Sequence, residues 1–172
     1  MRLGGLPLIP AEQIQNRVRE LGAQITRQYK GSELSLVVVL KGAIVFASDL
    51  MRALDVDVSL NFIRARSYAG TESKGTVSFT LLPDMMLEDR QVLVVEDILD
   101  TGRTCTEVMQ WISKHRPTSI RLCALLDKPD RRVIPVEADF KGFVIEDHFV
   151  VGYGLDFEER YRNLPAIHVM EA

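Results

Sequence analysis

The sequence has few of the features that mark secreted, membrane-spanning or nucleic-acid-binding proteins. It has two cysteines in 172 residues and no Cys-x-x-Cys pair, so neither a disulfide framework nor a zinc site is expected. No apolar run approaches membrane-spanning length, and the first residues (MRLGGLP) are too short and too broken by glycine and proline for a signal peptide. The formal net charge is −3 with no basic tract, which argues against a nucleic-acid partner. These absences favour a cytoplasmic protein in which Cys105 and Cys123 are buried thiols.

The chain does have a large apolar fraction, 47% of its residues, which is enough for a sizeable core. Its length predicts one domain with at most a small appendage. Apolar stretches typical of strands alternate with helical patterns, as in the α/β class. The expected strands are residues 34–40, 56–66, 77–82, 92–95, 119–126, 142–146 and 167–170. The expected helices begin at about residues 10, 44 and 104.

One stretch, residues 91–104 (QVLVVEDILDTGRT), carries the strongest chemical signal. It begins with an apolar run typical of a strand buried on both faces of a parallel sheet. Two carboxylates, Glu96 and Asp97, interrupt the run, and Val108, Trp111 and Ile112 follow at helical spacing. The pattern predicts a strand, an acidic turn, a phosphate-sized loop and a helix.

The loop of this stretch suits a phosphate group. A helix N-terminus offers free N–H groups and a partial positive charge. Gly102 would let the backbone approach the anion without a Cβ in the way. Thr101 and Thr104 add hydroxyl donors, and Arg103 adds charge.

The carboxylates of the stretch suit a different part of the ligand, because they would repel a phosphate. Glu96 and Asp97 can accept hydrogen bonds from sugar hydroxyls or hold a divalent cation that itself carries phosphate. An acidic pair beside a phosphate loop therefore indicates a phosphorylated sugar bound with magnesium.

Simpler interpretations of the same residues exist. Glu96 and Asp97 could be a solvated strand end, with Asp100 as an ordinary helix N-cap. A Walker P-loop is excluded because its Gly-x-x-x-x-Gly-Lys-Ser/Thr pattern is absent. An aspartyl-phosphate phosphatase is disfavoured because Asp97 and Asp100 are three residues apart rather than two.

Residues 94–104 (VVEDILDTGRT) resemble the phosphoribosyl diphosphate (PRPP) motif of the type I phosphoribosyltransferases, and within that family the hypoxanthine(-guanine) enzymes are most similar. The resemblance covers about residues 34–165 and includes four motifs in the family's order. It implies a twisted, mainly parallel sheet with helices on both faces plus a small hood. Residues 1–172 are then one domain, with a core of about 34–140 and a hood from the N-terminal and C-terminal segments, the first thirty residues included.

The function that the resemblance implies is purine salvage. The 5-phosphoribosyl group of PRPP is transferred to a 6-oxopurine base, which yields the nucleoside monophosphate (IMP or GMP) and pyrophosphate. The choice among hypoxanthine, guanine and xanthine stays open. Mg²⁺ is the implied cofactor, and a homodimer or homotetramer is the implied assembly.

The chemistry of this reaction and the resemblance together assign site residues. Asp100 is the candidate general base, because the purine becomes a better nucleophile if the proton on N7 is removed as N9 attacks. The residues assigned to PRPP and pyrophosphate are Glu96, Asp97, Thr101, Gly102, Arg103, Thr104, Lys41, Gly42 and Arg162, with a cis peptide before Lys41. Those assigned to the purine are Lys128, Phe149, Val150 and Asp156. Glu96, Asp97 and Asp156 are assigned to the metal, and Ser67 and Tyr68 to a lid that closes over the reacting centre.

Two other classes of protein could share the phosphate motif. A regulator of this fold could bind PRPP as an effector and act on nucleic acid, but it would need a basic face. A plain nucleotide-binding module would explain the loop but not Lys128 and Phe149. The acidic net charge and those two residues favour the enzyme.

Overall fold

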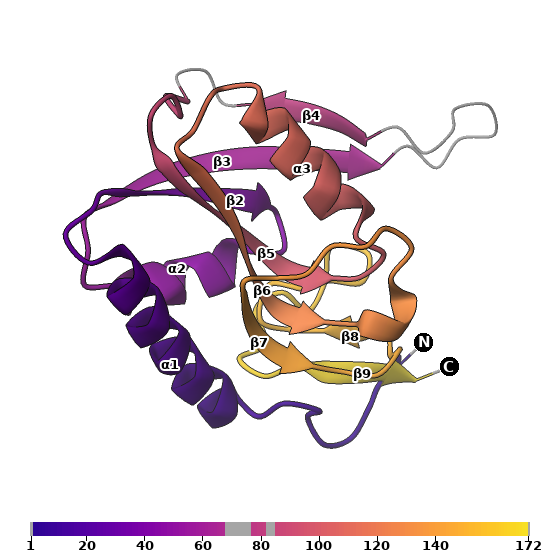
Figure 1. Cartoon of the computed structure of the whole chain (residues 1–172). Coiled ribbons are helices and arrows are strands. Elements are labelled where there is room, and N and C mark those ends of the chain that lie inside the picture. The colour runs from indigo at the N-terminus through magenta and orange to yellow at the C-terminus, as the bar shows by residue number, and fades with distance from the viewer. Residues whose placement is uncertain (1, 68–76, 82–84, 172) are drawn as a thin grey trace, which may run out of the picture.

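The described chain folds into a large sheet covered by helices on both faces and a smaller sheet beside it (Figure 1). The computed structural model describes residues 2–67, 77–81 and 85–171. No helix in these ranges is long and apolar enough to cross a membrane.

The large sheet contains a five-stranded parallel portion. Its strand order is β4 (Val77–Leu81), β3 (Val58–Ser67), β2 (Leu34–Leu40), β5 (Gln91–Leu99), β6 (Ser119–Asp127) and β7 (Phe140–Val144). Strands β3, β2, β5, β6 and β7 run parallel, and the edge strand β4 is antiparallel to β3. Strand β5 lies in the interior of the sheet, and its apolar run is buried on both faces, as such runs in parallel sheets are.

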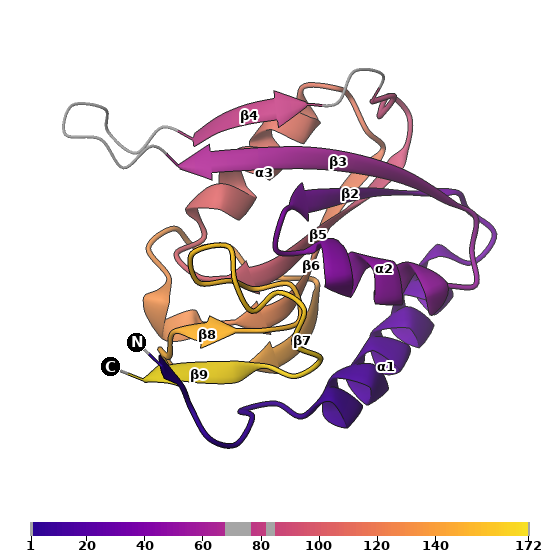
Figure 2. The ribbon, with the colours of Figure 1, turned by 180° about the vertical axis from the view of Figure 1, so that it is seen from behind.

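Helices cover both faces of this sheet and create two cores. Helices α1 (Ala11–Tyr29) and α2 (Ile44–Arg52) lie on one face, and α3 (Arg103–Ser113) lies on the other (Figures 1 and 2). Successive side chains of a strand point to opposite faces. In β5, Leu93 and Val95 therefore pack with α1 and α2, whereas Val92 and Val94 pack with α3.

The small sheet joins the two ends of the chain and forms the hood. Its order is β1 (Arg2–Leu3), β9 (His168–Glu171) and β8 (Val150–Val151), all antiparallel. The termini consequently lie side by side (Figures 1 and 2). Among the first thirty residues, Arg2 and Leu3 belong to this sheet and Ile9 forms an isolated bridge to Ile167. Helix α1 instead buries its apolar stripe against the large sheet.

The predicted fold class is confirmed, and some element boundaries differ. Strand β5 runs through the acidic pair to Leu99, because β6 stays paired with it as far as Asp127, whereas pairing with β2 ends at Val95. Residues 129–131 form a short 3₁₀ helix, η1 (Pro129–Arg131), which was not predicted. Cys105 and Cys123 are both buried and free, and burial raises the pKa of each thiol.

Helices α1 and α2 touch at a glycine, and this contact yields a stability prediction. We expect Gly22→Ala to destabilise the fold, although alanine is favoured over glycine in a helix by about 1 kcal/mol. A Cβ at Gly22 would lie 2.5 Å from the carbonyl oxygen of Ala53, so the helices would have to separate. The free energy of unfolding in urea should fall by about 1–3 kcal/mol. Exposed Ala23, mutated to glycine, is the control and should lose no more than about 1 kcal/mol. A gain in stability for Gly22→Ala would show that the helices separate without cost.

Candidate active site

The acidic pair of β5 lies just beyond Val95, the last residue at which β5 pairs with the neighbouring strand β2. Glu96 is only 6% exposed and Asp97 is partly buried. Both line a cavity of about 290 Å³ at the carboxyl edge of the sheet. Ligands of open α/β folds bind at this edge. The cavity is lined by Val39, Leu40, Gly42, Glu96, Asp97, Ile98, Asp100, Thr101, Gly102, Thr104 and Cys105.

Burial makes the ionised form of both acids unfavourable. Desolvation raises the pKa of Glu96 well above its usual value, and the adjacent charge of Asp97 raises it further. Desolvation also raises the pKa of Asp97, against the lowering effect of the hydrogen bond from the Ile98 N–H, 2.7 Å from Asp97 Oδ1. A cation or a set of hydroxyl donors placed against this pair would favour ionisation.

The loop after the pair leads directly into α3. Gly102 is the residue before the helix and has a φ of +85°, which glycine adopts at little cost. Gly102 has no side chain with which to cap α3, and the Arg103 N–H donates to Thr101 Oγ1 at 3.4 Å, so the N–H groups of the next residues of the first turn are the ones a ligand can use. The carbonyl of Thr101 accepts hydrogen bonds from the N–H groups of Val133 and Ile134, at 2.9 and 3.1 Å, which fix the loop.

The structure gives Gly102 a second reason besides the expected one. A Cβ there would lie 2.7 Å from the carbonyl oxygen of Ile134 and from a methyl group of Val136, so the missing side chain makes room for these protein atoms. Thr101 and Thr104 line the cavity, whereas Arg103 is exposed and does not line it.

A second loop lies against the acidic pair. The Leu40–Lys41 peptide is cis, as the family resemblance implied, and Gly42 lies next to Asp97. A Cβ at Gly42 would overlap the Asp97 carboxylate, so any other residue here would force that side chain to move. The N-terminal end of α2 therefore borders the same cavity as the N-terminal end of α3.

Two cations assigned to pyrophosphate share one carboxylate. Lys41 Nζ lies 2.8 Å from Glu159 Oε1, and Arg162 Nη2 lies 3.2 Å from Glu159 Oε2. Arg162 also pairs with Asp156 Oδ1 at 2.7 Å, while the Glu159 N–H donates to Asp156 Oδ2 at 2.9 Å. The hydrogen bonds from Lys41 and Arg162 lower the pKa of Glu159, so its side chain is favoured in the ionised form.

Asp100 lies at the mouth of the cavity beside two arginines that sequence reasoning did not assign. Arg131 Nε donates to Asp100 Oδ1 at 3.2 Å. Arg132 donates to the carbonyl oxygens of Leu99, at 2.9 Å, and Asp100, and it pairs with the buried carboxylate of Asp127. Arg132 thereby fastens the segment that carries Asp100. An acid at the end of β6 followed five residues later by arginine was the available signal.

Lys128, the candidate purine contact, is almost fully buried, with 7% of its surface exposed. Its Nζ donates to the carbonyl oxygen of His148 at 2.5 Å and lies 3.6 Å from Asp147. Its backbone N–H donates to the carbonyl oxygen of Leu99 at 3.0 Å. The backbone of Lys128 is thus tied to the end of β5, and its ammonium group is held by the segment that precedes Phe149.

Phe149 and Val150 present an aromatic face and free backbone groups. Phe149 is 46% exposed and meets Phe157 edge to face, with ring centroids 5.7 Å apart. The Met170 N–H donates to the carbonyl oxygen of Phe149 at 2.8 Å. Because hydrogen-bonded pairs alternate in an antiparallel ladder, the N–H and C=O of Val150 point away from β9. They are therefore directed toward the open edge of the hood.

The remaining assignments concern the residues of a lid and those of a metal site. Ser67 ends β3, and its side chain and Tyr68 lie outside the described residues. The described residues contain no cluster of three His, Cys, Asp or Glu side chains that could enclose a metal. Magnesium usually takes one or two protein carboxylates together with water and substrate phosphates. The donor set, with Glu96 and Asp97 adjacent, fits an ion of that kind.

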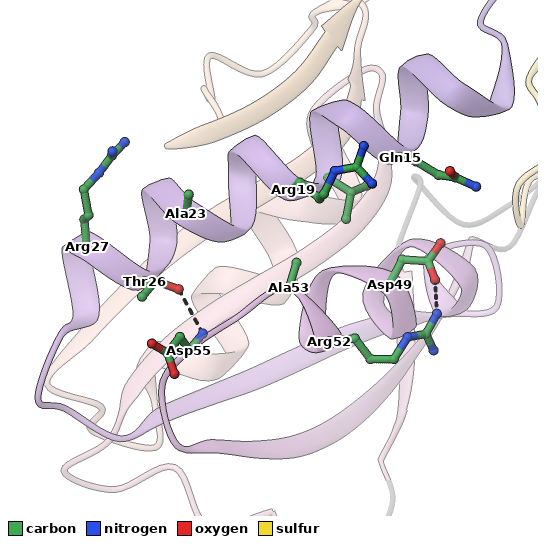
Figure 3. A pocket seen from close by; sticks show the side chains of 10 residues that line it. Gln15, Arg19, Ala23, Thr26, Arg27, Asp49, Arg52, Ala53 and Asp55 are labelled. Carbon is green, nitrogen blue, oxygen red and sulfur yellow. Dashed lines mark hydrogen bonds and ion pairs between the residues drawn. The ribbon is translucent and has the colours of Figure 1, made fainter.

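A larger cavity lies elsewhere and lacks this chemistry. It has a volume of about 780 Å³ and lies between α1 and α2 (Figure 3). Arg19, Arg27 and Arg52 stand at its rim, and Arg52 pairs with Asp49 there. The smaller cavity combines the acidic pair with an uncapped helix, and we take it as the candidate site for that reason.

Known proteins are similar to this chain over most of its length. The phosphoribosyl transferase domain family matches residues 10–158. The hypoxanthine-guanine phosphoribosyltransferase of Staphylococcus aureus (strain Mu50 / ATCC 700699) is 43% identical over 165 residues, which cover 95% of this chain and 92% of that protein. The bifunctional protein TilS/HprT of Listeria monocytogenes serotype 4b (strain F2365) is also 43% identical over 95% of this chain, but the match spans only 26% of the length of that relative.

A solved structure is similar throughout. The crystal structure of a hypoxanthine-guanine phosphoribosyltransferase from Bacillus anthracis superposes with a TM-score of 0.93 and 42% identity, covering 99% of this chain and 100% of that one. Since the family match spans most of the chain and the S. aureus relative is matched over nearly its whole length, this chain belongs to the phosphoribosyltransferase family, in its hypoxanthine-guanine branch.

Proposed function

We propose that the protein transfers the 5-phosphoribosyl group of PRPP to a 6-oxopurine base, giving IMP or GMP and pyrophosphate, in purine salvage. The observation that carries this proposal is the buried acidic pair next to the uncapped N-terminus of α3. Family membership supports the same reaction. Hypoxanthine is the expected base, and guanine and xanthine remain to be compared.

PRPP has three parts, and the site offers a different kind of group to each. The N–H groups of α3 and the hydroxyls of Thr101 and Thr104 suit the 5-phosphate. Glu96 and Asp97 can accept hydrogen bonds from the ribose hydroxyls. Lys41, Arg162 and the backbone at Gly42 suit the pyrophosphate.

A magnesium ion fits this arrangement as the cofactor. Glu96, Asp97 and Asp156 are the residues that would hold it, directly or through water. When bound, magnesium neutralises charge on the phosphate oxygens and so favours departure of the pyrophosphate. Lys41 and Arg162 place positive charge against the same leaving group, where negative charge develops in the transition state.

Asp100 is the proposed general base. As N9 of the purine attacks the sugar carbon, the proton on N7 becomes more acidic, and removing it makes the purine a better nucleophile. The Arg131 hydrogen bond and the Arg132 anchor hold Asp100 at the mouth of the cavity. Positioning of this kind contributes to the rate because the base is already oriented toward the proton before the reaction begins.

The purine site is proposed to consist of Lys128, Phe149 and Val150. The exposed face of Phe149 can stack on the base, and the free backbone groups of Val150 can bond to its edge. The Lys128 ammonium is a donor with no acceptor capacity, so it favours a base with an oxygen at this position. Ser67 and Tyr68 are proposed to close over the bound substrates and exclude water.

The surroundings of the enzyme are also proposals. Two buried free thiols suit a reducing compartment, so we place the protein in the cytoplasm. Large apolar side chains are exposed on α2 and β3, at Ile44 and Leu60, and they support a dimer or tetramer.

The role of Asp100 is tested by Asp100→Asn. Asparagine keeps the shape of the side chain but cannot take a proton, so kcat should fall by about 10²–10⁴-fold. Affinity for PRPP should change little, because the phosphate contacts come from other residues. Asp130→Asn, an exposed change in η1, is the control and should leave kcat unaltered. An unchanged kcat in Asp100→Asn would remove this residue from the mechanism.

The choice of base is tested by comparing hypoxanthine with adenine in the presence of PRPP and magnesium. Adenine would turn an amino group toward the Lys128 ammonium, which sets two donors against each other and leaves the adenine amino group without an acceptor from this side chain. Sites built on such a hydrogen bond reject the mismatched analogue by about 10⁴-fold or more. We therefore expect kcat/KM for adenine to be lower by that order. Values within about tenfold of each other would contradict the 6-oxopurine assignment.

A further inference from the structure

Glu159 occupies the position between two cations that the proposed function needs for pyrophosphate. One of its oxygens meets Lys41 at 2.8 Å and the other meets Arg162 at 3.2 Å. A carboxylate that bridges two cations in this way presents two oxygens much as one phosphoryl group of pyrophosphate would. Lys41 and Arg162 therefore cannot give their full charge to a ligand until Glu159 releases them.

The backbone around Glu159 holds the side chain in this place. Residues 157–160 form a tight turn, in which the N–H of Phe157 bonds to the carbonyl of Arg160 at 3.2 Å and the reverse bond is 3.0 Å. The two central residues, Glu158 and Glu159, have φ values of +52° and +63°. Such turns strongly prefer asparagine or glycine at both positions, because a side chain is unfavourable there. Two glutamates in an unfavourable conformation direct attention to what their side chains do.

The two glutamates differ in their contacts. Within the described residues, Glu158 has no ion pair, whereas Glu159 bridges Lys41 and Arg162. The Glu159 side chain is also 64% exposed, so it can swing into solvent without disturbing a core.

We propose that Glu159 occupies the pyrophosphate-binding cations between turnovers and competes with pyrophosphate and PRPP for them. This inference rests on the proposed function of Lys41 and Arg162. Binding of the diphosphate group displaces Glu159, and departure of the pyrophosphate lets it return. Glu159 thereby weakens the affinity for pyrophosphate and speeds its release, which matters for an enzyme whose product carries several negative charges.

The test is Glu159→Gln, with Glu158→Gln as a matched control. Each variant removes one negative charge from the same turn, but only the first frees the two cations. Titration calorimetry with pyrophosphate in excess magnesium should show a Kd about three- to tenfold lower for Glu159→Gln, as expected for the loss of exposed ion pairs. For Glu158→Gln the Kd should change less than about twofold. KM for PRPP should fall in parallel in Glu159→Gln, while KM for hypoxanthine stays the same.

A second variant locates the effect. In a Lys41→Met background, one of the two cations for which Glu159 and pyrophosphate compete is absent. Glu159→Gln should therefore lower the Kd for pyrophosphate by a smaller factor in this background than in the parent. Thermal unfolding of every variant checks that the fold is intact.

Three results would overturn the proposal. Weaker pyrophosphate binding in Glu159→Gln would mean that Glu159 positions the cations for the ligand. Equal tightening in both variants would mean a general effect of charge, and an unchanged Kd would mean no competition. If the parent transfers phosphoribosyl groups and the variants give any of these results, only the inference about Glu159 fails. If the parent binds neither pyrophosphate nor PRPP, the proposed function fails with it.

Discussion

The candidate site depends on two adjacent carboxylates at the end of an interior strand, one buried and one partly buried. Strand β5 is buried on both faces as far as Val95, and Glu96 and Asp97 follow without a break in the strand. No lysine or arginine pairs directly with either acid within the described residues, and desolvation raises both pKa values. Unpaired buried charge is unfavourable. The pair is accordingly a poor element of a stable core and a good receptor for a ligand that brings cationic charge and hydroxyl donors.

The rest of the site is built around that pair. Gly42 permits the first loop to touch Asp97, and Gly102 permits the second loop to turn into α3 against residues 134–136. The C-terminal segment is fastened to the same region, because Tyr153 donates from Oη to Asp49 Oδ2 of α2 at 2.5 Å. Burial raises the pKa of Tyr153, so it remains a protonated donor. This bond ties α2, which follows Lys41, to the segment that carries Arg162.

The sequence was informative where the chemistry is local and contiguous. The apolar run of β5, the adjacent acids and the glycine loop predicted a strand, an acidic turn, a loop and a helix. The strand, loop and helix occur in that order, whereas the acids lie inside the strand and not in a turn. Contacts between distant segments could not be predicted. Arg132 reaches back to residues 99 and 100, Lys128 is buried against His148, and Glu159 bridges Lys41 and Arg162. Each depends on how separate loops meet at one sheet edge, which no periodicity in the chain records.

The central claim is that the acidic pair costs stability and is kept for binding. It is tested most directly by the free energy of unfolding of Glu96→Gln and the parent at about pH 5 and about pH 8. Because the pKa of Glu96 is raised in the folded state, the parent should lose stability as pH rises above the ordinary glutamate pKa of about 4.3. The variant should therefore be more stable than the parent, by about 1 kcal/mol or more at the higher pH and by less at the lower. A variant that is no more stable than the parent, or whose advantage does not grow with pH, would contradict the account.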